Sequence, residues 1–75
     1  MEVTPGALKH GIPRAAILAV VAAPLRSVPQ GERTLCIGLG PGRDLLEVVV
    51  DGDRVVHAMR LRPKNYPHLE GRPGG

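Results

Sequence analysis

Aromatic residues are almost missing from this chain. The 75 residues include no phenylalanine and no tryptophan, and Tyr66 is the single tyrosine. A core must therefore be built from valine, leucine, isoleucine and alanine. A chain this short buries roughly 60% of the surface that its unfolded form exposes, so we expect marginal stability. We predict one small domain over residues 1–75, with residues 72–75 frayed.

Cysteine is nearly absent as well, since Cys36 is the only one. This excludes a disulfide framework and a cysteine-rich zinc site, and it favours a reducing cytoplasm as the location. The three histidines, His10, His57 and His68, do not show the spacing of metal ligands. We therefore expect neither a metal nor a cofactor.

Long apolar runs are also lacking. The longest covers residues 15–23, which is too short for a bilayer span of about 20 residues, so no membrane partner is expected. Pro13 and Pro24 bracket this run as the start and end of a helix. Because its apolar residues surround the helix axis, we predict that one side meets the sheet and another meets a second chain, giving a homodimer or a heteromeric complex through residues 13–23.

Strand patterns dominate after Pro24. Short β runs cover residues 25–28, 33–39, 45–50 and 54–62, separated by turn residues, and a short strand over 1–4 and a helical turn over 6–11 come first. The glycine-rich stretch 38–44 lacks the Lys-Ser/Thr of a phosphate loop and precedes a strand, so it is interpreted as a hairpin loop. The predicted fold class is α+β, with N-terminal helices packed on an antiparallel β-meander of three or four strands.

The dipeptide Asp51-Gly52 predicts a tight hairpin between the last two strands. If Val50 pairs with Asp53, a register follows that divides the side chains between two faces. The helix face would carry Leu46, Val48, Val55, His57, Met59 and Leu61, and the opposite face would carry Glu47, Arg54, Arg60 and Arg62.

The segment 57–66, HAMRLRPKNY, gathers most of the candidate chemistry. His57 is interpreted either as a half-buried structural histidine or as a general acid or base, because histidine titrates near neutral pH. Arg60, Arg62 and Lys64 either block edge-to-edge pairing of the strand or bind phosphate. Tyr66 could stack on a base or donate a proton.

Several segments together resemble the BrnT-type family of small bacterial toxins, and in particular its actinobacterial branch. These are LKHGI at residues 8–12, followed by a helix, then PQGERTLCIG at 29–38, GRDLLEVVV at 42–50 and VVHAMRLRPKNY at 55–66. The resemblance covers roughly residues 8–69. It implies a RelE-like ribonuclease fold, metal-independent RNA cleavage and a cognate antitoxin, commonly a DNA-binding protein.

The resemblance also implies roles for individual residues. Arg60 or Arg62 would stand for the arginine of the family's Ser-Ala-Arg motif, although no serine is present here. The implied reaction is attack of a ribose 2′-OH on the adjacent phosphate. The base would be Glu47 or His57, with Glu47 favoured because it shares a face with Arg60. The acid would be Tyr66 or His10, and the phosphate ligands would be Arg60, Arg62, Lys64 and Lys9.

A non-catalytic function is the alternative. The same basic segment could bind an acidic antitoxin, or the chain could be a toxin relic that only dimerises or assembles with a partner. The C-terminal part allows either function, since residues 54–75 contain five lysines and arginines but only one acidic residue.

Overall fold

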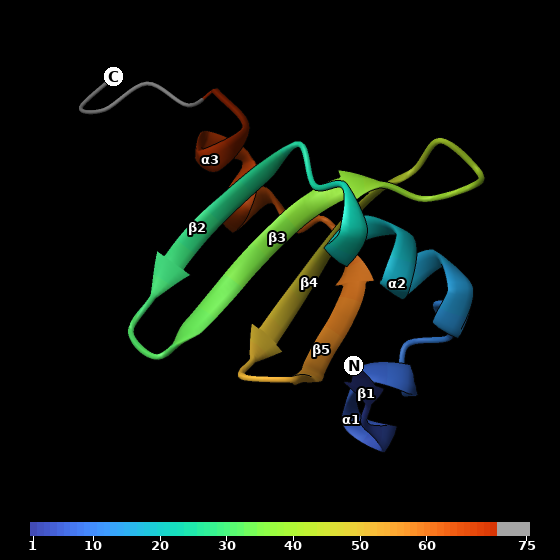
Figure 1. Cartoon of the computed structure of the whole chain (residues 1–75). Helices are drawn as coiled ribbons and strands as arrows, with labels where there is room; N and C mark the ends of the chain where they lie inside the picture. Colours follow the sequence, from blue (N-terminus) through green and yellow to red (C-terminus); the bar gives the residue numbers. More distant parts are fainter. Residues whose placement is uncertain (71–75) are drawn as a thin grey trace.

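A computed structural model describes residues 1–70 of the chain. The fold is α+β, as predicted, with five strands and short helices (Figure 1). The fraying expected for residues 72–75 lies outside the described residues. The elements are β1 (Glu2–Val3), α1 (Pro5–Leu8), α2 (Arg14–Ala22), β2 (Arg26–Gln30), β3 (Arg33–Leu39), β4 (Leu45–Asp51), β5 (Arg54–Arg60), the 3₁₀ helix η1 (Pro63–Asn65) and α3 (Tyr66–Glu70).

The sheet is larger than predicted and mixed rather than purely antiparallel. Its strand order is β1-β5-β4-β3-β2, and β1 pairs in parallel with β5 through Val3 and Val55. The Thr4 N–H donates to the carbonyl of Val55 at 3.1 Å and extends this pairing. Parallel pairing is possible because residues 4–53 form a long connection between the two strands. At the other edge, β2 accommodates Pro29, which an edge strand tolerates.

The β4–β5 hairpin exists, but the predicted register is wrong. Asp51 pairs with Arg54, so the two loop residues are Gly52 and Asp53, and Gly52 has a φ of +63° as predicted. A β-bulge then shifts the pairing between Val50↔Val55 and Val49↔His57. Because a bulge opposes two residues to one, it reverses the alternation of side chains beyond it. His57 therefore shares a face with Glu47 and Val49, and Leu46 is the residue opposite Arg60.

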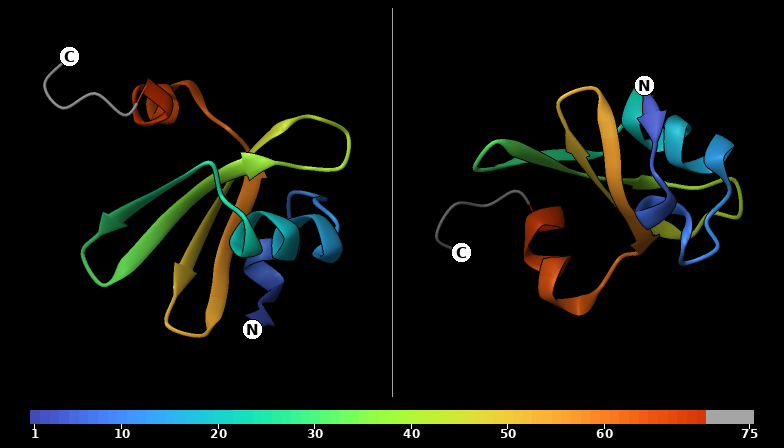
Figure 2. Two further views of the ribbon diagram at one scale, coloured as in Figure 1. Left: turned by 45° about the horizontal axis from the view of Figure 1, so that its top comes forward. Right: turned by 90° about the horizontal axis from the view of Figure 1, so that it is seen from below.

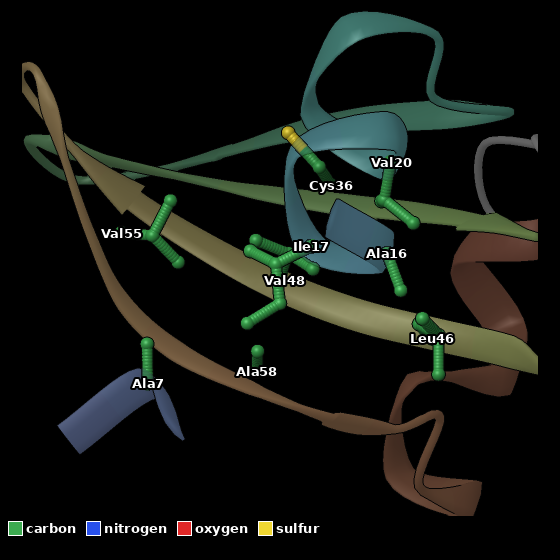
Figure 3. Packing of buried hydrophobic residues seen from close by; sticks show 9 residues of the cluster. All are labelled: Ala7, Ala16, Ile17, Val20, Cys36, Leu46, Val48, Val55 and Ala58. Carbon is green, nitrogen blue, oxygen red and sulfur yellow. The ribbon is translucent and has the colours of Figure 1, made fainter. Parts of the chain in front are cut away.

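Helices α1 and α2 cover one face of the sheet and form the main core (Figure 3). Ile17 and Val20 of α2 are fully buried against Val48 of β4 and Cys36 of β3. Ala7 of α1 lies in the same cluster. Aliphatic side chains make up this core together with Cys36, and no aromatic ring takes part, as the composition predicted. We call this side of the sheet the α2 face.

The opposite face of the sheet is covered by η1 and α3 (Figure 2). Leu35 and Ile37 are buried there with Leu61, and Leu69 of α3 packs against them. Glu47 lies between Leu45 and Val49 along β4 on this side. We call this side of the sheet the Glu47 face.

The outward side of α2 is made mainly of alanines. Ala15, Ala19 and Ala22 are exposed, whereas Leu18 and Val21 are half-buried. One side of the helix is thus buried on the sheet, as predicted, and association through residues 13–23 stays a prediction. Across residues 1–70, no helix has both the length and the apolar character needed to cross a membrane.

Candidate functional site

The centre of the candidate site is the carboxylate of Glu47, which has 0% exposure although it is charged. It lies in the middle of β4 on the Glu47 face, among valines and leucines. A buried charge is costly unless it is paired and hydrogen-bonded. Both carboxylate oxygens are accordingly engaged by donors from β5 and from the segment that follows it.

Arg62 and Asn65 supply most of these donors. The Arg62 backbone N–H donates to Oε1 at 2.8 Å, and its guanidinium contacts Oε2 through Nε at 2.8 Å and Nη2 at 2.7 Å. The Asn65 amide donates to Oε1 at 3.0 Å. Pro63 allows this geometry because it cannot continue the strand and instead begins η1, which turns the chain back over the sheet.

These contacts determine the ionisation of Glu47. Burial by itself raises the pKa of Glu47, but the hydrogen bonds from the Arg62 side chain and backbone, Asn65 and His57 outweigh it and lower the pKa from 4.5 to about 2. At neutral pH the carboxylate is therefore ionised, enclosed and a weak proton acceptor. Its position suits the orientation of neighbouring groups better than proton transfer.

His57 completes the set of Glu47 partners from β5. Its Nε2 lies 2.8 Å from Glu47 Oε2, and the His57 side chain is 23% exposed. Because an ionised carboxylate only accepts hydrogen bonds, Nε2 carries the proton in this contact. In the neutral imidazole the lone pair is then on Nδ1. A carboxylate that fixes the tautomer in this way prepares a histidine for proton transfer.

A second imidazole stands beside the first. The ring centroids of His10 and His57 are 5.8 Å apart, and their planes are inclined by 74°. His10 follows α1, which packs against β5, and Gly11 with a φ of +81° turns the chain directly after it. The N-terminal LKHGI segment and the HAMRLR strand, more than forty residues apart in sequence, thus bring two histidines together.

The other predicted site residues lie outside this cluster. Arg60 is 77% exposed and contacts Asp44 at 3.6 Å, rather than sharing a face with Glu47 as predicted, because the bulge changes the register. Tyr66 is half-exposed and lines a pocket with Arg60. Lys9 and Lys64 are exposed, and neither forms an ion pair with the side chains that the structure describes.

Asn65 is a partner of Glu47 that the sequence pattern does not reveal. One signal pointed towards it: a glutamate inside the apolar run LLEVVV must be buried and therefore needs several donors. The sequence does not show which donors fold back onto it, since that depends on the turn at Pro63. Among residues 1–70, no three or more histidine, cysteine, aspartate or glutamate side chains group as a metal site would require.

Comparison with known proteins gives no relative. No protein-family model, no curated protein and no solved structure matches the chain. The cluster formed by His10, His57, Glu47, Arg62 and Asn65 must therefore be interpreted from its own geometry, and we call it the His–Glu cluster.

Proposed function

We propose that the chain is a metal-independent endoribonuclease, and that it is the toxin of a BrnT-type toxin–antitoxin pair with a RelE-like fold. One observation carries the catalytic part: His57 is held by a buried carboxylate at 2.8 Å, with a second imidazole 5.8 Å away. A general acid–base cleavage of RNA requires two neighbouring groups, one to take a proton from the 2′-OH and one to give a proton to the leaving oxygen. The sequence resemblance supports the family and its fold.

In the proposed reaction, the ribose 2′-OH attacks the adjacent phosphorus while His57 removes the 2′ proton. The bond from phosphorus to the 5′ oxygen breaks, and His10 gives a proton to that leaving oxygen. The products are a 2′,3′-cyclic phosphate and a free 5′-OH. His57 replaces Glu47 as the favoured base because the pKa of Glu47, about 2, leaves the carboxylate too weak to take the proton. Glu47 instead acts as the residue that orients His57 and Arg62.

Arg62 is the cation placed best for the phosphate. Its side chain is 39% exposed, while Nε and Nη2 are held by Glu47. Preorganised cations stabilise the charge of a phosphorane without reorganising during the reaction. Lys9, next to His10, and Lys64, in η1, would extend the positive surface around the RNA backbone.

An antitoxin is the proposed protein partner. The exposed lysines and arginines of the chain suit an acidic partner segment, and an antitoxin bound there would cover the same groups that contact RNA. Expression of the chain in a bacterial host, with and without the protein encoded beside its gene, tests this directly. Growth arrest that the neighbour relieves is the expected result, and unaffected growth would contradict the toxin assignment.

The catalytic proposal is tested by cleavage of single-stranded RNA in the presence of a metal chelator. We expect cleavage to persist with the chelator and to leave 2′,3′-cyclic phosphate ends. His57→Gln keeps an N–H donor but cannot transfer a proton, so it should lower the rate by about 100-fold or more, as should His10→Ala. His68→Ala, which takes no part in the Glu47 hydrogen bonds, is the matched control and should cleave like the wild type.

A non-catalytic module would give a different pattern. The purified wild-type chain would then leave RNA intact, and the histidine variants would differ from it only in antitoxin affinity. Cleavage that the chelator abolishes would instead overturn the metal-independent mechanism.

A further inference from the structure

A separate pocket lies next to the His–Glu cluster, at the end of the sheet where β4 begins and β5 ends. Its position follows from the chain: Leu45 is two residues before Glu47 on β4, Leu61 precedes Arg62, and Tyr66 follows Asn65. The Leu61 N–H donates to the Leu45 carbonyl at 2.9 Å and holds these segments together. The pocket is lined by Asp44, Leu45, Arg60, Leu61, Tyr66 and Leu69.

The lining of this pocket is amphipathic in a particular way. Three leucines and Tyr66 supply the apolar part of the lining. Tyr66 is 52% exposed, so a ligand can reach it. At the same pocket, Arg60 Nη2 and Asp44 Oδ2 lie 3.6 Å apart, so a donor fork stands next to an acceptor carboxylate. The two charges form only an exposed, loose pair, so a ligand can replace their contact at little cost.

A nucleobase matches both the apolar part and the charged part of this lining. Unstacked RNA bases are recognised by stacking on an aromatic ring and by hydrogen bonds to their Watson–Crick edges. Guanine presents two neighbouring donors, N1–H and N2–H, that a carboxylate can accept together, with the acceptor O6 beside them for an arginine. Adenine, cytosine and uracil do not offer two adjacent donors to a carboxylate.

We propose that this pocket binds a guanine base of the RNA substrate, with Tyr66 stacking on the base, Asp44 accepting from N1–H and N2–H, and Arg60 donating to O6. The inference deepens the proposed ribonuclease function, because it gives that site a base preference. Arg60 and Tyr66 thereby act in substrate binding, while the chemistry stays with the histidines. Because Leu61 and Tyr66 of the pocket are chain neighbours of Arg62 and Asn65, the guanine would belong to a nucleotide close to the phosphate that Arg62 contacts.

Binding can be measured without cleavage, because Tyr66 is the only tyrosine and gives a single pair of ring signals in a proton NMR spectrum. We would titrate the protein with the four ribonucleoside 3′-monophosphates, which share their sugar and phosphate and differ in the base. GMP should shift the Tyr66 ring signals upfield through stacking, and it should bind at least tenfold more tightly than AMP, CMP or UMP. Inosine monophosphate, which lacks the N2 amino group, should bind several-fold more weakly than GMP.

Asp44→Asn tests whether the Asp44 carboxylate recognises the guanine base. It should lower GMP affinity about tenfold or more and bring it to the level of AMP, because the amide cannot accept from both donors. Asp51→Asn is the matched control, since Asp51 also forms a partly exposed pair with an arginine, Arg33, at the other end of β4. This control should bind GMP like the wild type.

Three results would overturn the inference: no shift of the Tyr66 signals, equal affinities for all four nucleotides, or a preference for another base. Failure of the two proposals can be told apart. GMP binding without RNA cleavage refutes the ribonuclease and leaves the base site, whereas cleavage without selective GMP binding refutes the base site alone.

Discussion

The two faces of the sheet use the same strands but are stabilised by different means. On the α2 face, Ile17, Val20 and Val48 are fully buried, and the stabilisation comes from apolar surface removed from water. On the Glu47 face, a charged carboxylate with 0% exposure is surrounded by donors. An apolar core tolerates substitution by other apolar residues of similar size, whereas a buried charge requires particular hydrogen-bonding partners. The second face therefore depends on particular polar side chains as well as on buried apolar surface.

The bulge in β5 is what makes the second face possible. Without it, His57 would point towards the α2 face and a polar ring would enter an aliphatic core. With it, Val55 and Ala58 pack in the α2 core while His57 reaches Glu47. One additional residue thus lets Val55 and Ala58 face the α2 core and His57 face Glu47, which is how a bulge redirects a side chain.

The largest loss of folding stability is expected from a substitution in the α2 core. Ile17→Asp places an unpaired carboxylate where the side chain has 0% exposure, and the cost should exceed the whole stability of so small a domain. Circular dichroism and urea unfolding would show a chain without a cooperative transition. Ala19→Asp, on the exposed side of the same helix, is the control and should change the free energy of unfolding by less than about 1 kcal/mol. A folded Ile17→Asp protein would refute the assignment of this face as the main core.

The second largest change is a loss of folding stability at low pH, and it comes from Glu47. The pKa of Glu47 is about 2 in the folded state and 4.5 in a model peptide, so its ionised form stabilises the fold above pH 4.5. This contribution is lost as the pH falls from about 4.5 to 2. Since one pKa unit corresponds to 1.36 kcal/mol, the loss amounts to roughly 3 kcal/mol. Urea unfolding at a series of pH values measures it.

Glu47→Gln provides the comparison for that pH series. The amide has a similar shape but cannot ionise, so the variant should be less stable at pH 7 and should lose much less stability on acidification. Glu32→Gln, in an exposed turn, should follow the wild-type profile. Equal acid sensitivity of the wild type and Glu47→Gln would show that Glu47 does not carry the proposed ion pairing.

Prediction from sequence succeeded where the signal was local. The helix bracketed by Pro13 and Pro24 and the turn glycine Gly52 follow from the conformational limits of proline and glycine, and the structure confirms them. The strand runs after Pro24 were also found. The sequence does not reveal the pairing of β1 with β5, because the two strands are far apart along the chain and no local pattern indicates their contact.

The candidate site was predicted only in part, for the same physical reason. Glu47, His57, His10 and Arg62 were all named as site residues, but their partnership depends on the bulge in β5. A shift of one residue moves every later side chain to the other face, and the valine pair at 55–56 gives no sign of the shift. An uninterrupted alternation therefore groups Arg60 with Glu47 and places His57 on the α2 face.

A smaller effect is expected at the β4–β5 turn that sets the hairpin. Gly52 has a φ of +63°, which a β-branched side chain resists, so Gly52→Val should destabilise the fold by about 1 kcal/mol or more. Nothing lies within 4 Å of a Cβ at this position, so the cost comes from the backbone alone. Gly52→Asn should cost less, because asparagine tolerates positive φ. Similar urea midpoints for both variants would contradict a strained turn.

The smallest effect should come from Arg60, and it contrasts most clearly with Arg62. Arg60 contacts Asp44 at 3.6 Å, and both side chains are more than half exposed, so Arg60→Ala should change stability by only a few tenths of a kcal/mol. Arg62→Ala removes two guanidinium contacts from a fully buried carboxylate and should cost several times more, since an uncompensated charge would be left. Urea unfolding of the two variants at pH 7 decides the matter. Equal losses of stability would mean that the exposed Arg60–Asp44 pair and the buried Arg62–Glu47 pair contribute alike, which would contradict the stronger role of Arg62.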